Sequence, residues 1–428
     1  MKKAIPFSPA DILLPPADII ARGTWACIAC DQFTSEPDYW ADAAAIVADA
    51  PSTLHLMLPE VYLSESEHRL PKIHAAMKEA LETVLQVHPN SMIALSRVQS
   101  DGRVRHGLVG MIDLEEYDYR KGATSLIRAT EGTVLSRIPP RVAIRRDAPL
   151  ELPHVMLLID DPEDTVLGPL FTEQAQRLAK PAYDCPLMLS GGHATGVFLT
   201  NEQMDAVHDA MEALMSPEGM ATRYGDATLA PLLFAAGDGN HSLASAKAAY
   251  EEVKSALGAQ AAASHPARYA LCEVVNLHDR ALNFEPIYRV VFGADREDIL
   301  SALRTYLAEL NGTAQAQVIR CVFGVPGHPL TIDLHAQHPT QQLTVGTLQT
   351  FLDEYAATHP EIEIDYIHGE DSLTTLACRD GAIGFLFDGM QKDQLFRTVI
   401  YDGALPRKTF SMGHARDKRY YMECRKIR

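Results

Sequence analysis

The sequence has no long apolar segment and no excess of basic residues. No stretch approaches the roughly 18 consecutive apolar residues that a membrane-spanning helix requires. Lys and Arg number 38 and Asp and Glu number 56, which gives a formal net charge of −18. A surface of that sign repels phosphate backbones and anionic lipids. We therefore expect neither nucleic acid nor a membrane as a partner, although one local pocket can still bind a single phosphate.

Cysteine is scarce, and its pattern does not indicate a disulfide framework or a zinc site. The chain contains seven cysteines, an odd number. Cys27 and Cys30 form one CxxC, but no second CxxC completes a set of four ligands. The segment Thr24–Asp31 is typical of a buried strand, on which positions i and i+3 face opposite sides. We therefore expect two inert packing cysteines. The odd number of scattered cysteines also indicates a reducing, cytoplasmic location. The N-terminal apolar run, which Pro6 and Pro9 interrupt, is too short for a signal peptide.

Several catalytic signatures are also missing. GxSxG is absent, which argues against an α/β-hydrolase nucleophile elbow. None of the 17 histidines stands in HxH, HxxxH or HExxH spacing, so a metal site of His154, His193 and His241 would require the fold to bring them together. Neither a P-loop nor a dinucleotide-binding fingerprint is present.

Segments typical of strands and helices alternate along the chain. The pattern predicts an α/β or α+β fold with mixed sheets and flanking helices. It predicts a helix at Leu70–Gln86, a strand pair at Met92–Gln99 and Val104–Leu114, and a strand near Thr398–Tyr401. The pattern changes after Phe292. We therefore place a boundary near residue 293, between a main domain, 1–293, and a smaller C-terminal α/β subdomain, 294–428.

The strongest chemical signal is the segment from Gly237 to Ser242. It lies between an expected buried strand, Ala230–Ala236, and an expected helix, Leu243–Leu257. Glycine permits close approach of the backbone to a ligand, and the amides at a helix N-terminus favour an anion. A helix cap formed by one side chain would explain one polar residue in this segment. It does not explain the succession of carboxylate, amide, imidazole and hydroxyl at Asp238, Asn240, His241 and Ser242. We interpret the segment, including Gly237 and Gly239, as a phosphate-binding turn.

Other polar segments admit two interpretations each. Arg128 and Arg141 belong either to an ion-paired surface loop or to an anion-binding clamp. Asp31 and Glu36, in a polar loop after a buried strand, are either functional groups or part of a capped helix start before Pro37. His193 follows two glycines in a strand and is more typical of a hydrogen-bonded partner than of a catalyst. The basic run from Arg416 to Arg428 is more typical of a terminal strand with charged edges than of a nucleic-acid site.

Several motifs resemble a family catalogued as domain of unknown function 1015. The segment Asp238–Ser242 corresponds to a D-G-H-H-R block, and Ile127–Thr133 to a block with an H-E-x-T pattern. Further matching blocks are His154–Pro162, Pro286–Arg289, Tyr366–His368 and Leu405–Thr409. The resemblance runs nearly from end to end and is specific for the family.

The D-G-H-H-R block also resembles the phosphate-binding signature of the ParB/sulfiredoxin-type nucleotide-binding fold, which includes a free-serine kinase. The resemblance implies a ParB/sulfiredoxin-like core that binds ATP or ADP with Mg²⁺. It implies Asp238 as catalytic base and Glu36 as a further catalytic candidate. From the residue types, we add His241 as a catalytic candidate and Asp31 and Asp238 as metal ligands. Ser242 replaces the arginine of the block. Arg128, Arg141, Arg289 or Lys408 would then supply the missing positive charge, Lys408 from the C-terminal subdomain.

These observations lead to three functional hypotheses. The first is a nucleotide-dependent kinase that phosphorylates a hydroxyl of a small molecule, such as free serine. The second is a nucleotide- or metabolite-binding regulatory protein without turnover, which the serine at position 242 favours. The third is a metal-assisted hydrolase that uses His241 and Asp238. We expect a small-molecule substrate and allow for assembly into a homo-oligomer.

Overall fold

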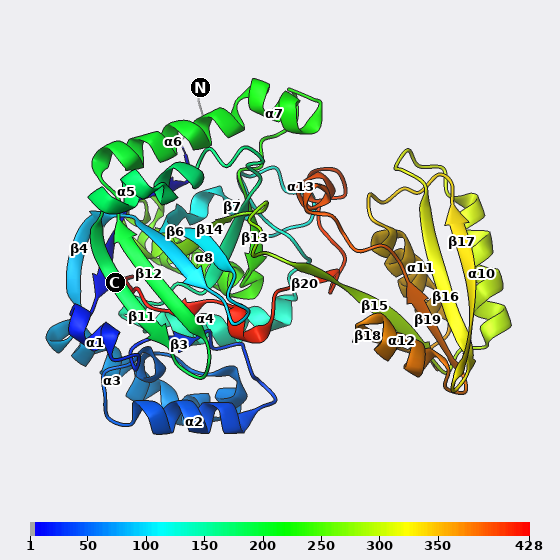
Figure 1. The fold of residues 1–428 in the computed structure, drawn as a ribbon, viewed down its shortest axis with the longest axis horizontal. Helices are drawn as coiled ribbons and strands as arrows, with labels where there is room; N and C mark the ends of the chain where they lie inside the picture. Colours follow the sequence, from blue (N-terminus) through cyan, green and yellow to red (C-terminus); the bar gives the residue numbers. More distant parts are fainter. Residues whose placement is uncertain (1–4) are drawn as a thin grey trace. The chain divides into compact units, whose positions relative to one another are not determined.

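The computed structural model describes residues 5–428 and divides the chain into two compact units (Figure 1). Unit 1 contains the chain up to Ala129, Thr133–Leu282 and Gly413–Arg428, and unit 2 contains Thr130–Gly132 and Asn283–Met412. The predicted boundary near residue 293 differs from this division in three places, the first being Thr130–Gly132, which belong to unit 2. Strand β15 (Phe284–Phe292) already belongs to unit 2, and the last 16 residues belong to unit 1.

Unit 1 is built on a ten-stranded mixed sheet. Its strand order is β11-β12-β5-β6-β14-β10-β13-β8-β7, and β1 pairs with β6 beside this path. The pairs β10–β14, β13–β8 and β7–β8 are parallel, and the others are antiparallel. The strands are β1 (Phe7–Ser8), β5 (Ile93–Val98), β6 (Val104–Asp113), β7 (Tyr117–Asp118), β8 (Ile127–Ala129), β10 (Val155–Ile159), β11 (Lys180–Leu187), β12 (Gly192–Phe198), β13 (Phe234–Asp238) and β14 (Tyr269–Asn276).

Helices cover both faces of this sheet because its central strands are apolar on both sides. Along β6, Leu108 and Val109 point into different apolar clusters, as the two-residue period of a strand requires. One cluster contains residues of α2 and α3, and the other contains residues of α6 and α8. In Figure 1, α2 and α3 (blue) accordingly lie on one side of the strands and α6 (green) lies on the other. The helices are α2 (Pro37–Val47), α3 (Ser66–Thr83), α4 (Ile138–Arg146), α6 (Asn201–Met215), α7 (Pro217–Tyr224) and α8 (Asn240–Leu257), with shorter ones at α1 (Ala17–Ala21), α5 (Glu173–Leu178) and α9 (Ala259–Ala262).

Unit 2 contains a six-stranded antiparallel sheet flanked by four helices. The order is β17-β16-β19-β15-β18, and β20 pairs with β15. The strands other than β15 are β16 (Gln317–Val325), β17 (His328–Ala336), β18 (Glu363–His368), β19 (Ala382–Leu386) and β20 (Phe410–Met412). The helices are α10 (Arg296–Glu309), α11 (Thr344–Thr358), α12 (Glu370–Ala377) and α13 (Lys392–Tyr401).

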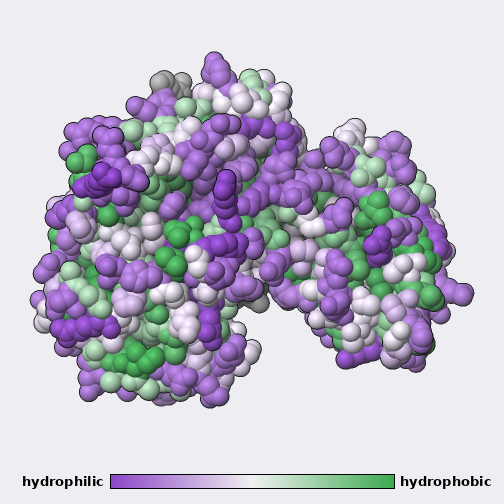
Figure 2. Space-filling model, viewed as in Figure 1, coloured by the Kyte–Doolittle hydropathy of each residue, from purple (hydrophilic) through white to green (hydrophobic). Residues whose placement is uncertain are grey.

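The predicted class, α/β with mixed sheets and flanking helices, is confirmed. One local prediction is wrong, because residues 398–401 end helix α13 instead of forming a strand. A capping box of Gln391 and Gln394 starts this helix, and Leu395, Phe396 and Val399 bury one of its faces. Figure 2 shows hydrophilic residues over much of the visible surface, with apolar residues in separate patches. Among the described residues, no helix has the length and apolarity needed to cross a bilayer.

The C-terminal residues form part of the core of unit 1. Strand β21 (Tyr420–Tyr421) pairs with β3 (Cys27–Ile28), and β22 (Arg425–Lys426) pairs with β9 (Leu150–Glu151). The expected terminal strand is therefore present, but most of the segment is buried instead of forming a charged edge. Its charges are neutralised internally, because Glu273 lies 2.8 Å from Arg419 and 3.3 Å from Arg105.

We expect the substitution Glu273→Gln to destabilise unit 1 strongly. Glu273 is fully buried, and its removal leaves two buried guanidinium groups without their shared carboxylate. Breaking a buried ion pair from one side costs about 3–5 kcal/mol of unfolding free energy. Urea unfolding monitored by circular dichroism tests this, with Glu252→Gln as the matched control in an exposed pair with Arg146. Equal unfolding midpoints for the two variants would contradict the prediction.

Candidate functional site

The turn between β13 and α8 has the geometry expected of a close-approach loop. Gly239 adopts φ = 78°, in the left-handed region that favours glycine. A Cβ atom at this position would lie 2.8 Å from Cδ2 of His154. Helix α8 begins at Asn240, and no side chain caps it at Gly239. Conventional capping therefore does not explain the polar residues of the turn, and the 18-residue helix directs its positive dipole end toward this point.

A lysine from the C-terminal segment lies beside this turn. Lys418 Nζ is 3.2 Å from Oδ2 of Asp238, and both side chains are largely buried. The other carboxylate oxygen of Asp238 accepts a hydrogen bond from the amide of Gly239 at 3.1 Å. The charge of Lys418 also acts on Asp31. The ammonium group of Lys418 thus pairs with Asp238 and acts through its charge on Asp31, which lies 207 positions before Asp238 in the sequence.

Asp31 belongs to a second buried array that contains His154 and Tyr421. His154 Nε2 lies 3.2 Å from Oδ2 of Asp31, and Nδ1 lies 2.6 Å from the hydroxyl oxygen of Tyr421. That hydroxyl donates to Sγ of Cys30 at 3.3 Å and accepts from the backbone amide of Cys30 at 3.2 Å. Polar contacts therefore connect a carboxylate, an imidazole, a phenol and a thiol, each to the next.

Electrostatics within this array maintain a charged pair. Burial disfavours ionisation of Asp31, but the charge and hydrogen bond of His154 outweigh it and hold the pKa of Asp31 below its ordinary value. Burial likewise disfavours protonation of His154, but its interactions with Tyr421 and Asp31 raise its pKa well above the ordinary value. In its protonated form, which this shift favours, the ring donates from Nε2 to Asp31 and from Nδ1 to Tyr421.

A cavity of about 160 Å³ adjoins this array. Ser242 of α8, Cys30, His154 and Tyr421 form part of its wall, together with Arg141 of α4. The rest of the lining comprises Leu56, Met57, Leu58, Glu60, Leu63, Met77, Ile144, Arg145, Ala148, Leu150, Glu151, Leu152 and Ser245. Its volume equals about five water molecules at roughly 30 Å³ each. A mostly apolar wall with a few convergent polar groups is typical of a small-molecule site.

Of the predicted cations, only Arg141 lines this cavity, where it forms an ion pair with Glu60. Arg128 is buried and donates to three backbone carbonyls, those of Ser125, Ala230 and Pro231, so its guanidinium supports a loop. Burial lowers the pKa of Arg128 to about 10.

Arg289 and Lys408 lie in unit 2. The guanidinium of Arg289 donates to the carbonyl oxygens of Arg407 and Lys408 and to Gln349, and burial lowers its pKa to about 10. Lys408 Nζ lies 4.7 Å from the centre of the Tyr366 ring. That either residue contributes to the phosphate-binding turn stays a prediction.

The predicted catalytic side chains do not all converge. His241 Nε2 accepts a hydrogen bond from the backbone amide of Val134 at 3.2 Å, so its ring stabilises a loop. Glu36 is exposed immediately before α2 and is not among the residues that line the cavity. His193 pairs with Asp184, as expected of a hydrogen-bonded partner. In the described part of the chain, no three His, Cys, Asp or Glu side chains are arranged to hold a metal ion, so the three-histidine site is not found.

Three site residues escaped the sequence-based prediction. Lys418 and Tyr421 lie in the basic C-terminal run. In the sequence, this run stood out only by its many charged residues and tyrosines. Cys30 was predicted to be an inert packing residue. Its partner Cys27 is buried, and burial raises the pKa of its thiol to about 12, but Cys30 follows the end of β3 and lines the cavity.

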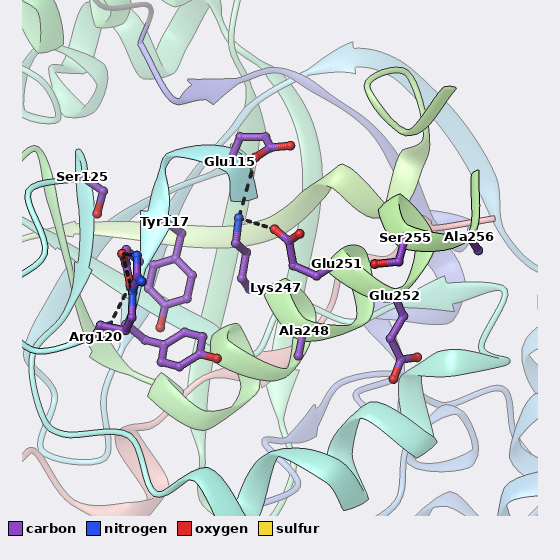
Figure 3. Close-up of a pocket in the computed structure, with 12 residues that line it drawn as sticks. Glu115, Tyr117, Arg120, Ser125, Lys247, Ala248, Glu251, Glu252, Ser255 and Ala256 are labelled. Atoms are coloured by element: carbon purple, nitrogen blue, oxygen red, sulfur yellow. Dashed lines mark hydrogen bonds and ion pairs between the residues drawn. The ribbon is translucent and has the colours of Figure 1, made fainter. Parts of the chain in front are cut away.

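A larger cavity, of about 1050 Å³, lies along the other part of α8 (Figure 3). Lys247 stands there between Glu115 and Glu251, 3.8 Å and 2.9 Å from their carboxylate oxygens. Lys254 also pairs with Glu115, at 2.6 Å. Four carboxylates line this cavity and only two cations, Arg120 and Lys247, so it is a poorer candidate for a phosphate than the turn.

The His154 pair defines a pH range for its contribution to stability. The raised pKa of His154 stabilises the folded state. This stabilisation is fully present below the unfolded-state pKa of about 6.5 and is lost as the pH rises through the folded-state pKa. The lowered pKa of Asp31 also stabilises the folded state. This stabilisation is fully present above the unfolded-state pKa of about 3.9 and is lost as the pH falls through the folded-state pKa. Both stabilising contributions are therefore fully present between about pH 3.9 and about pH 6.5.

We expect His154 to remain protonated at pH 7.5 in the wild-type protein and to become neutral in Asp31→Asn, because burial then dominates its pKa. The imidazole proton and carbon chemical shifts of His154, followed by NMR from pH 6 to pH 9, measure this. Asp184→Asn, which removes the partner of His193, is the control and leaves the His154 titration unchanged. A wild-type His154 that titrates near pH 6.5 would show that the charged pair does not form.

Comparisons with known proteins identify the family. No curated protein matches the chain. Solved structures with some likeness include a conserved hypothetical protein from Pyrococcus furiosus, at 10% identity and a TM-score of 0.33, covering 71% of this chain and 89% of that one. A free serine kinase in complex with ADP has 10% identity and a TM-score of 0.37, covering 74% and 91%. TM-scores this low assign neither fold nor activity. The family model described as "Protein of unknown function (DUF1015)" matches residues 8–381, and the chain therefore belongs to this family.

Proposed function

We propose that unit 1 binds the phosphate groups of a nucleotide at the β13–α8 turn and transfers a phosphoryl group to a hydroxyl of a small molecule in the adjacent cavity. One observation carries this proposal. Asp238 and Lys418 pair beside a glycine turn at the N-terminus of α8, Lys418 also acts electrostatically on Asp31, and Ser242 of the same helix lines the cavity. Phosphoryl transfer depends mainly on such positioning and electrostatic stabilisation.

The turn supplies the two features that a phosphate requires. The backbone approaches closely at Gly239, and the dipole of α8 favours negative charge there. The family block has arginine where this chain has Ser242, and Lys418 provides a cation beside the turn instead. An ammonium group is a suitable phosphate partner, although it lacks the bidentate geometry of a guanidinium.

The carboxylates suit the remaining tasks. Asp238 is the candidate base for the acceptor hydroxyl, because its carboxylate lies beside Lys418 and adjoins Gly239. Asp31 and Asp238 are the residues that would hold Mg²⁺, a cation that prefers carboxylate oxygens and neutralises phosphate charge when bound. The protonated His154 fixes the orientation of Asp31 and presents a positive charge to the cavity.

The cavity restricts the acceptor to a small molecule. Its wall is mostly apolar, and its cations Arg141 and Arg145 already pair with Glu60 and Glu151. A zwitterion such as free serine would have to exchange partners with the Arg141–Glu60 pair. A hydroxy compound with a hydrocarbon part would instead bury that part against the leucines and methionines.

We expect wild-type protein to bind ATP or ADP and Lys418→Met to bind it roughly 10- to 100-fold more weakly, because one charge-assisted contact to phosphate is lost. Isothermal titration calorimetry with and without Mg²⁺ measures the affinity. Lys426→Met, at an exposed position of the same C-terminal segment, is the control and retains wild-type affinity. The absence of nucleotide binding by the wild-type protein would rule out the proposed function.

We expect Asp238→Asn to lose about 10²–10⁴-fold in kcat, the usual contribution of a general base. Phosphorylated product is measured by mass spectrometry over a panel of serine, threonine, homoserine and simple aliphatic hydroxy acids. Asp205→Asn, on the exposed face of α6, is the control. Nucleotide binding without product for any acceptor would instead support the regulatory protein, which the Ser242 substitution favours.

A further inference from the structure

A third, much smaller cavity lies under the C-terminal segment of unit 1, and none of its lining residues belongs to the proposed nucleotide turn. Its volume is about 10 Å³, which suits a single guest of atomic size. Three buried arginines line it, Arg97, Arg105 and Arg419, each at most 3% exposed. The other lining residues are Leu95, Tyr183, Ala194, Tyr420 and Met422.

Each arginine uses both terminal nitrogens within the protein. Arg97 donates to the carbonyl oxygens of Val98, at 2.5 Å, and Arg416, at 3.1 Å. Arg105 donates to the carbonyl oxygen of Asp417, at 2.8 Å, and to Glu273, at 3.3 Å.

Arg419 completes the set in the same way. It donates to Glu273, at 2.8 Å, and to Glu423. In all three arginines Nε is buried, and none of the three Nε–H groups has a hydrogen-bond acceptor in the structure of residues 5–428. Buried donors without acceptors are rare in folded proteins and cost roughly 1–3 kcal/mol each. Three of them around one cavity indicate a missing acceptor.

The lining contains more donors without partners than a water molecule can satisfy. The hydroxyl of Tyr183 donates to Glu423, at 2.5 Å, and the hydroxyl of Tyr420 donates to the carbonyl oxygen of Met188, at 3.2 Å. The remaining lining side chains, Leu95, Ala194 and Met422, are apolar. A water oxygen has two lone pairs and would accept from two of the three Nε–H groups. A monoatomic anion accepts several hydrogen bonds and can satisfy all three.

The charged groups that line the cavity are all cations, the guanidinium groups of the three arginines. Three carboxylates balance them in number, those of Glu273, Glu423 and Asp417, but none of these belongs to the lining. The Asp417 carboxylate also accepts a hydrogen bond from the amide of Ser100 at 2.8 Å. Burial, together with the like charge of Arg105, lowers the pKa of Arg97 to about 10. An anion in the cavity would relieve this repulsion.

We propose that a monoatomic anion, chloride in the cell, binds among the Nε–H groups of Arg97, Arg105 and Arg419. The anion connects the β5–β6 hairpin, which carries Arg97 and Arg105, to the C-terminal segment, which carries Arg419. That segment also carries Lys418 and Tyr421 of the candidate site, so the anion stabilises their placement. The proposal does not depend on nucleotide binding or phosphoryl transfer.

Thermal unfolding of the full chain tests the proposal with chloride itself. At constant ionic strength, replacing sodium gluconate with sodium chloride or bromide should raise Tm by about 3 °C and saturate with concentration, because the anion binds only the folded state. Arg97→Met should abolish this dependence. The matched control Arg320→Met, in an exposed pair with Asp333, should retain it.

A crystal of the wild-type protein grown in bromide provides a second readout that does not require a variant to fold. An anomalous peak between the three Nε atoms is expected. A Tm that does not change between chloride and gluconate, together with an ordered water and no anomalous peak in the cavity, would overturn the proposal. A Tm effect that Arg97→Met retains would place the chloride elsewhere and also overturn it.

Discussion

The placement of the C-terminal segment in unit 1 depends on the buried carboxylate of Glu273. This group lies on the central strand β14 and pairs with Arg105 on the neighbouring β6 and with Arg419 near the chain end. An ion pair at this depth stabilises the fold only when its remaining hydrogen-bonding groups are satisfied. Arg419 meets this requirement in part through Glu423, whose other carboxylate oxygen binds Tyr183 on β11. The segment is therefore held by charges from three strands of the sheet.

This placement determines the chemistry of the candidate site. Lys418 immediately precedes Arg419, and Tyr421 follows it by two residues, so one anchored segment supplies both the cation beside Asp238 and the phenol beside His154. The strand pairing of Tyr420 with Ile28 fixes the same segment against the loop that contains Cys30 and Asp31. The site thus combines residues from the two ends of unit 1 with a turn from its middle, and it forms only when the chain termini are in place.

The sequence predicted local features better than long-range ones. The β13–α8 turn follows from two glycines between an apolar strand and an amphipathic helix, which are interactions within about twenty residues. Lys418 could not be assigned because its role depends on a strand pair that spans almost the whole chain. The alternation of a longer strand does not place Cys30, because β3 contains only Cys27 and Ile28. Cys30 packs against the apolar core, as predicted, and also lines the cavity, which the sequence did not indicate. The β-branched residues Thr398, Val399 and Ile400 favour a strand locally, but the burial of Leu395 and Phe396 on one helical face outweighs that preference.

The formal charge of −18 describes the surface of the folded protein as well as its composition. In the part of the chain that the structure describes, the buried charged residues are six arginines and six carboxylates: Arg97, Arg105, Arg128, Arg289, Arg419, Arg425, Glu151, Asp160, Asp161, Glu273, Asp417 and Glu423. Burial therefore removes equal numbers of cations and anions, and the surface keeps the acidic balance that disfavours long-range attraction of polyanions. A small anion, in contrast, is recognised at short range, over a few ångströms. A helix N-terminus, Lys418 or unsatisfied Nε–H groups can provide that recognition. An acidic protein can thus exclude extended polyanions and retain interior positions suited to a single phosphate or halide.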